Sequence, residues 1–475
     1  MPKRRVAEWV VVGVLSCLLL LGGFLVAVFH APLLTAAGLT REGAPDTVDV
    51  SIFAPQVEES EAPATAGTGL AQAAEIPTDG KVPDSDTLTA QLKALDRSNL
   101  KAADGTKVTV AWEVVDVETG DVISSTKAKT ALIPASNTKL MTSLAVMNAF
   151  DGSETFATRV LQPADGEIVL VGGGDPMLLS TPADEGTYPQ PASTQELAAA
   201  TAEALKADGQ SSVTLGYDDS YFDEEGWNDT WPSNYRDQVT QLSSLWVDEG
   251  RTSGARTRTP AADAAKIFAT QLEKAGITVT GSVKERSGTG DEVARVESLP
   301  LHVLVETAMN RSNNSFTEIL GLQLAKQTGR DSTFKGAVAA IKSELTDLGV
   351  WDEGTVLRDS SGLSRSNRIT ANMLARAVQL LDTDEHLSVI LDGLPTAGVT
   401  GTLATRFTDA LARPARGVAS AKTGTLSLVS TLAGTTLTAD GRQVSFAFMI
   451  NGTDAGWWAK LWADQATGVV ASCGC

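Results

Sequence analysis

An uncharged apolar run near the amino terminus separates this 475-residue chain into parts that meet different solvents. The run covers Trp9–Phe29, 21 residues without a charge, and follows Lys3, Arg4 and Arg5. A helix of that length can cross a hydrocarbon layer of about 30 Å, and the run exceeds the roughly 7 to 15 apolar residues of a signal peptide. We therefore expect residues 1–30 to form a single-pass membrane anchor with its basic flank in the cytoplasm. A cleaved signal is the alternative, and either way the rest of the chain is expected on the extracytoplasmic side.

A low-complexity stretch follows at residues 31–86, rich in Ala, Pro, Thr, Glu and Asp and without a sustained apolar period. Such a composition buries too little apolar surface to fold, so we expect a disordered linker. The chain is longer than one compact core usually covers, which favours one long domain with an insertion, or two domains. The formal net charge of -20 argues against nucleic acid or an anionic lipid surface as the main partner.

Apolar periodicity predicts a mixed α/β (α+β) fold after the linker. Helices are expected at 88–95, from Ser136 to 150, and at 195–207, 261–275, 303–328 and 373–381. Strands are expected at 107–115, 121–125, 167–171, 212–217, 419–422, 428–438 and 442–450.

The scarcity of histidine and cysteine limits the chemistry. His30, His302 and His386 are not clustered, so neither a His-based metal site nor a Ser-His-Asp triad is indicated. Cys473 and Cys475 are so close in the chain that a bridge would be strained, and no Cys-based zinc site can be identified. We expect neither a metal nor a cofactor, and a base other than histidine if the chain is a hydrolase.

A lysine can replace histidine as the base when its amine is neutral, and Ser-x-x-Lys on a helix places hydroxyl and amine on one face. Ser136 and Lys139 have this spacing and precede an apolar helix, so Ser136 would lie where free N–H groups favour a developing negative charge. A serine N-cap is the structural alternative. The spacing alone is uninformative, because three other pairs share it: Ser98/Lys101, Ser124/Lys127 and Ser332/Lys335.

Two further stretches place polar residues where apolar ones are expected. Ser312-Asn313-Asn314 interrupts an apolar helical region, and Lys422-Thr423-Gly424 ends a predicted strand. The glycine permits close approach of a ligand to the sheet edge.

In this order, the three stretches resemble the sequence elements of penicillin-binding proteins and serine β-lactamases. The finer resemblance is to the class C low-molecular-mass penicillin-binding proteins, the D-alanyl-D-alanine carboxypeptidase/endopeptidase family. It covers roughly residues 86–460, with Asn313 where aspartate is usual and Leu426 after the third motif as departures. The motifs that carry it are PASNTK (134–139), GGGDP (172–176), MNRSNN (309–314), DSSGLSR (359–365), parts of 394–406, and KTGT (422–425).

The resemblance implies a β-lactamase/transpeptidase-like domain, an antiparallel sheet flanked by helices, formed by residues 87–155 and 290–475. An inserted subdomain at 156–289 would account for the 172 residues between Lys139 and Ser312.

The resemblance also implies that Ser136 attacks the penultimate D-alanine of a peptidoglycan stem peptide, with Lys139 as base. The pKa of Lys139 must then fall from about 10.4 to roughly 7 to 8. Burial lowers the pKa of a lysine, and a second cation, for which Lys422 is the natural candidate, acts in the same direction. Ser312 would relay the proton to the leaving amine, and Asn314 would hold the substrate backbone.

The remaining implied contacts bind the substrate. Lys422 and Thr423 would hold the terminal carboxylate, beside Gly424, and the N–H groups of Ser136 and Thr425 would form the oxyanion hole. Asp218 and Arg365 are suggested to meet the free end of a diaminopimelate side chain.

β-Lactams are expected as covalent inhibitors, and endopeptidase activity would use the same site. Two other functions compete with the carboxypeptidase. A β-lactamase shares the acylation residues, but no loop matches the water-activating glutamate of class A enzymes. A wall-binding protein without catalysis would not need these side chains.

Overall fold

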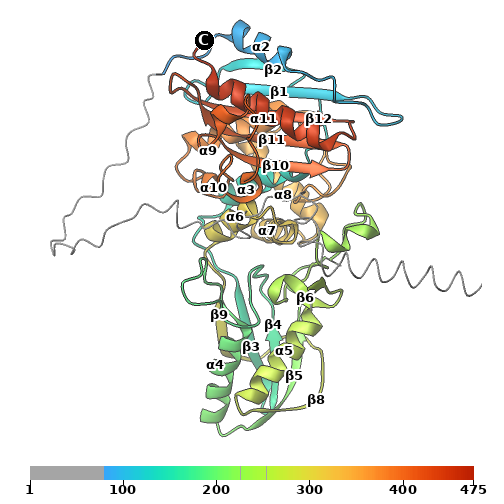
Figure 1. Cartoon of the computed structure of the whole chain (residues 1–475). Coiled ribbons are helices and arrows are strands. Elements are labelled where there is room, and N and C mark those ends of the chain that lie inside the picture. Colours follow the sequence, from blue (N-terminus) through green and yellow to red (C-terminus); the bar gives the residue numbers. More distant parts are fainter. Residues whose placement is uncertain (1–79, 225, 253) are drawn as a thin grey trace, which may run out of the picture. The chain divides into compact units, whose positions relative to one another are not determined.

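The computed structural model describes residues 80–475 except 225 and 253 (Figure 1). The expected anchor at 1–30 lies outside the described residues, as does most of the expected linker. Within the described part, none of the helices is both long and apolar enough to cross a bilayer. Helix α2 (Ser85–Ala94) begins after Asp84, whose side chain accepts a hydrogen bond from the Thr87 N–H at 2.9 Å and so caps the helix.

A five-stranded antiparallel sheet contains strands from both the first and the last parts of the described chain. Its order is β10-β11-β12-β1-β2, so β1 pairs along its whole length with β12, from Thr109 opposite Asn451 to Asp116 opposite Val444. The bounds are β1 (Thr109–Asp116), β2 (Val122–Thr126), β10 (Ser420–Leu426), β11 (Val429–Leu437) and β12 (Gln443–Asn451).

Helices cover both faces of this sheet, as alternate residues of β1 show. Val110, Trp112 and Val114 belong to an apolar cluster that includes residues of α2 and α11 (Gly456–Ser472). Ala111 and Val115 belong to the cluster on the other face. The helices there are α3 (Thr138–Ala149), α6 (Leu301–Asn310), α7 (Asn314–Gln327), α8 (Phe334–Asp347), α9 (Ala371–Thr383) and α10 (Val389–Asp392).

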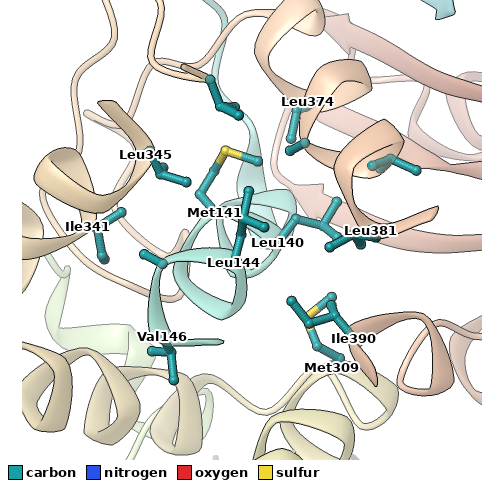
Figure 2. Close-up of a cluster of buried hydrophobic side chains, with 14 of the residues drawn as sticks. Leu140, Met141, Leu144, Val146, Met309, Ile341, Leu345, Leu374, Leu381 and Ile390 are labelled. Carbon is teal, nitrogen blue, oxygen red and sulfur yellow. The ribbon is translucent and has the colours of Figure 1, made fainter. Parts of the chain in front are cut away.

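Helix α3 lies at the centre of that second cluster (Figure 2). Its Leu140, Met141 and Leu144 are buried with side chains from α6, α8, α9 and α10. Burial of this helix on every side explains how a lysine on it can be removed from water.

A second sheet is formed by residues between 157 and 297, with the order β8-β5-β4-β3-β9. The β4–β5 and β5–β8 pairs are parallel, and α4 (Thr194–Ala207) and α5 (Pro260–Lys274) pack with it in a separate apolar cluster. Its strands are β3 (Ala157–Ala164), β4 (Glu167–Val171), β5 (Ser212–Asp218), β8 (Thr278–Glu285) and β9 (Asp291–Glu297), and a small ribbon pairs β6 (Arg251–Thr252) with β7 (Ala255–Arg256).

The expected mixed α/β fold, with sheets flanked by helices, is confirmed. The single helix predicted at 303–328 is wrong, because the chain leaves helical geometry at Arg311–Asn313 and α7 starts anew. Ser312 adopts a φ of 50°, a left-handed conformation that an uninterrupted helix cannot contain. A disulfide joins Cys473 to Cys475.

Candidate active site

Ser136 lies in the short 3-10 turn η2 (Ala135–Asn137), which leads directly into α3. Its hydroxyl accepts a hydrogen bond from the Lys139 amine at 3.2 Å. The N-cap residue of η2 is Pro134 and that of α3 is Asn137, so Ser136 caps neither element. The Ser136 hydroxyl is therefore paired with the Lys139 amine one turn later, and it is not used to cap the helix.

The Lys139 amine has no exposure to solvent and is held by three acceptors. Besides Ser136 Oγ, it donates to Asn314 Oδ1 and to the backbone oxygen of Ser361, both at 2.7 Å. Burial lowers the pKa of Lys139 from its ordinary 10.5 to about 7, although the negative charges of Glu318 and Asp359 act in the opposite direction. A lysine with this pKa can accept a proton near neutral pH.

A second lysine enters the site from the sheet. Lys422, on β10, is fully buried. Its amine donates to Ser312 Oγ at 2.8 Å and to the backbone oxygen of the next residue, Thr423, at 3.0 Å. Burial holds the pKa of Lys422 well below its ordinary value, and the nearby Lys139 lowers it further. Burial is thus the main cause of the lowered pKa of both amines, and the charge of Lys139 is a secondary cause for Lys422.

Ser312 and Asn314 come from the break between α6 and α7. Because Ser312 is left-handed, its hydroxyl turns to Lys422 while Asn314, at the start of α7, reaches Lys139. The structure therefore brings together Ser136, Lys139, Ser312, Asn314 and Lys422, which lie in three separate stretches of the sequence.

Edge strand β10 runs close along η2 because residue 424 is a glycine. A Cβ atom at Gly424 would lie 2.6 Å from the backbone oxygen of Pro134 and 3.2 Å from the backbone nitrogen of Ser136. Any side chain would push the strand away from the serine, so this glycine is required for the close approach.

An open cleft of about 470 Å³ lies over these groups. Its lining combines Ser136 and the Ser312–Asn314 turn with the end of β10 and with residues of the segment that carries η3 (Ser233–Asp237). The lining residues are Ser136, Asn234, Tyr235, Asp237, Gln238, Ser312, Asn314, Gly362, Leu363, Thr423, Thr425, Leu426 and Ser427.

The η3 segment was not anticipated from the sequence. Asn314 is fixed to it, since its Nδ2 donates to the backbone oxygen of Gln238 at 2.9 Å. This stretch has no apolar period and no motif, and only Pro232 and its polar composition could have marked it as a surface loop.

The structure separates the two residues suggested for diaminopimelate. Arg365 lies at the border of the cleft, where its Nη1 donates to the backbone oxygen of Ser427 at 2.7 Å. Asp218 ends β5, accepts from Ser220 and from the Gly288 N–H, and does not line the cleft. Asp237 lines the cleft instead, and its carboxylate accepts from Gln238 Nε2 at 2.9 Å.

Comparisons with known proteins agree with this geometry. The sequence profile of the D-Ala-D-Ala carboxypeptidase 3 (S13) family matches residues 92–255 and 248–460. Carboxypeptidase DacB of Mycolicibacterium smegmatis is 32% identical over 381 residues, which cover 77% of this chain and 81% of the relative. A D-alanyl-D-alanine carboxypeptidase of Actinomadura sp. is 27% identical over 431 residues, covering 71% of this chain and 77% of the relative.

Among solved structures, penicillin-binding protein 4 (dacB) of Haemophilus influenzae shares the fold. It superposes with a TM-score of 0.64 at 20% identity, covering 81% of this chain and 98% of that protein. Since the family profile spans most of the described residues and includes all three motifs, this chain belongs to the D-Ala-D-Ala carboxypeptidase 3 (S13) family of class C low-molecular-mass penicillin-binding proteins.

Proposed function

We propose that this chain is a serine D-alanyl-D-alanine carboxypeptidase that works through an acyl-enzyme. The observation that carries the proposal is the 3.2 Å contact between the buried Lys139 amine and the Ser136 hydroxyl, at the edge of an open cleft. A buried amine with a pKa of about 7 can take the hydroxyl proton without histidine or metal.

In the acylation step, Ser136 Oγ forms a bond to the carbonyl carbon of the penultimate D-alanine as its proton passes to Lys139. The amide C–N bond then breaks, and the proton that Lys139 accepted passes by way of the Ser312 hydroxyl to the departing D-alanine amine, which leaves Lys139 neutral again. Ser312 is hydrogen-bonded to Lys422. Water hydrolyses the resulting ester, which releases the shortened peptide and restores the Ser136 hydroxyl.

The rest of the cleft supports substrate binding. The backbone N–H groups of Ser136 and Thr425 would stabilise the oxyanion, and such donors typically contribute about 100- to 1,000-fold in rate. Lys422 and Thr423 would hold the terminal carboxylate, and the Thr423 hydroxyl already lies 3.0 Å from the Thr402 hydroxyl. β-Lactams, whose strained amide meets the same serine, would be covalent inhibitors.

The same catalytic groups would cut a peptide cross-link, so endopeptidase activity is part of the proposal. We also propose that residues 1–30 anchor the chain in the cell membrane and that 31–86 link the anchor to an extracytoplasmic catalytic domain (87–155 and 290–475), with 156–289 as an inserted subdomain. Membrane fractionation of the full chain tests the anchor, and its recovery with soluble protein would contradict that part.

Release of D-alanine from a stem pentapeptide tests the function. The wild type should release it steadily, and Ser136→Ala should fall to background, because the nucleophile is gone. Ser98→Ala is the matched control, since Ser98 has the same spacing to Lys101 but lies outside the cleft, and should behave as wild type. Equal background release by wild type and Ser136→Ala would refute the proposal.

A further inference from the structure

The backbone oxygen of Ser361 is one of the three acceptors of the Lys139 amine. It belongs to the turn at Asp359–Gly362, which lies against the start of α3. A Cβ atom at Gly362 would lie 1.9 Å from the backbone oxygen of Ala135, and Thr142, on α3, donates to the Ser360 backbone oxygen at 2.7 Å. The position of the Lys139 amine therefore depends on how this turn is held.

Glu318 holds the turn from α7. Its Oε2 accepts from the Ser360 N–H at 3.1 Å and its Oε1 from the Ser361 N–H at 2.8 Å. Glu318 is 1% exposed and follows Asn314 by four residues, one helical turn. One helix thus supplies both a direct acceptor for Lys139 and the support for a second acceptor.

Asp359 completes the support from within the turn. Its Oδ1 accepts from the Gly362 N–H at 3.0 Å, and its Oδ2 from the Ser364 N–H at 2.6 Å and from Trp231 Nε1 at 2.7 Å. Asp359 thus fixes the shape of the turn, while Glu318 fixes its orientation toward α3.

Charge adds a second effect. Burial lowers the pKa of Lys139, and the negative charges nearby oppose that effect. The charges that raise the pKa of Lys139 are those of Glu318 from α7 and Asp359 from the turn. Lys422 faces the site from β10, and the charge of Lys139 lowers the pKa of Lys422.

Burial, and next the charge of Asp359, raise the pKa of Glu318 to about 8, while its hydrogen bonds from Ser360 and Ser361 favour the carboxylate form. Glu318 therefore sets the position of the amine through the turn, and its ionised form raises the proton affinity of the amine.

We propose that Glu318 is a positioning residue for the acylation step: through the Ser360 and Ser361 N–H groups it aims the Ser361 carbonyl at the Lys139 amine, and its carboxylate form increases the proton affinity of that amine. The inference rests on the proposed roles of Ser136 and Lys139. Glu318 lies beneath the cleft and does not line it, so it acts through Lys139 and not on substrate.

The test is the pH dependence of acylation by a fluorescent penicillin, measured as a second-order rate constant. Glu318→Gln removes the charge and turns an amide N–H₂ toward one of the two N–H donors. We expect the acid limb, the pH range over which the rate constant rises, to move to lower pH by about one unit, because the amine loses a negative charge that raises its pKa. The plateau, the rate constant reached at high pH, should fall about 10- to 100-fold, because the amine is misplaced. Glu318→Asp keeps the charge but shortens the reach, so it should lower the plateau and leave the limb in place.

Glu113→Gln is the matched control. Glu113 is also buried, 3% exposed, but its carboxylate accepts from Asn372 on α9. The same chemical change there should leave both limb and plateau unchanged.

A folded Glu318→Gln protein with the wild-type limb refutes the proposal, even if its plateau falls, because a purely structural role would lower the rate alone. If circular dichroism shows that Glu318→Gln is unfolded, the acylation rate of Glu318→Asp is measured instead. A wild-type plateau in that variant refutes the positioning role. Failure of the wild type to be acylated at Ser136 would instead refute the proposed function, so the two failures are distinguishable.

Discussion

At the scale of single residues, the proton affinity of Lys139 makes the first prediction. Burial lowers its pKa to about 7, so the amine is protonated below that pH and neutral above it. Acylation of the wild type by benzylpenicillin should therefore rise through an acid limb near pH 7 and level off above it. Lys139→Arg should abolish acylation, since a guanidinium stays protonated. A rate independent of pH between about 5 and 9 would show that another group is the base.

Asn313, where the family pattern has aspartate, makes the second residue-scale prediction. Its Nδ2 donates to Glu249 Oε2 at 3.1 Å, and its Oδ1 caps α7 by accepting from the Phe316 N–H at 3.2 Å. Asn313→Asp would keep the cap but oppose two carboxylates, at a cost of about 1 to 3 kcal/mol in the free energy of unfolding.

Adding Glu249→Gln to Asn313→Asp should restore most of that stability, because an amide can again donate between the two side chains. Chemical denaturation of the two single variants and the double variant measures the coupling. Additive effects would mean that the contact contributes nothing.

At the scale of elements, the sequence predicted the strands better than the breaks between helices. The strands at 428–438 and 442–450 match β11 and β12 closely, because alternation along a long hairpin is a strong signal. The prediction of one helix at 303–328 was wrong at Ser312. That residue adopts a left-handed conformation that allows its contact with Lys422, and no local propensity of the sequence indicates it. Helices α8 and α11 were missed, as were strands β3, β8 and β9 of the second sheet.

The third prediction concerns the segment that carries η3. Asp237 lines the cleft, whereas Asp218 at the end of β5 does not, so recognition of a free amine on the substrate's third residue should depend on Asp237. Asp237→Asn should lower kcat/KM by about tenfold for a diaminopimelate peptide relative to an analogue without that amine, as expected for loss of a charged hydrogen bond.

Asp218→Asn is the comparison, since its carboxylate is occupied by Ser220 and Gly288. If Asp218→Asn lowers kcat/KM for the diaminopimelate peptide, relative to the analogue, as much as Asp237→Asn does, then Asp218 and not Asp237 alone recognises the amine.

At the scale of the whole described chain, the residues that converge at the cleft could be predicted from the sequence, and the residues that support them could not. Ser136, Lys139, Ser312, Asn314 and Lys422 stand in short motifs whose order is informative. Glu318 carries no motif, because its role follows from the packing of α7 against the turn at Asp359–Gly362, which is 41 residues later in the sequence. Long-range contacts of this kind leave no local pattern.

The central claim is that distant stretches converge on one nucleophile, and intact mass followed by peptide mapping after incubation with benzylpenicillin tests it most directly. The account predicts one covalent adduct on the wild-type protein, on the peptide that contains Ser136, and none on Ser136→Ala. An adduct on any other residue, or the same adduct on Ser136→Ala, would contradict it.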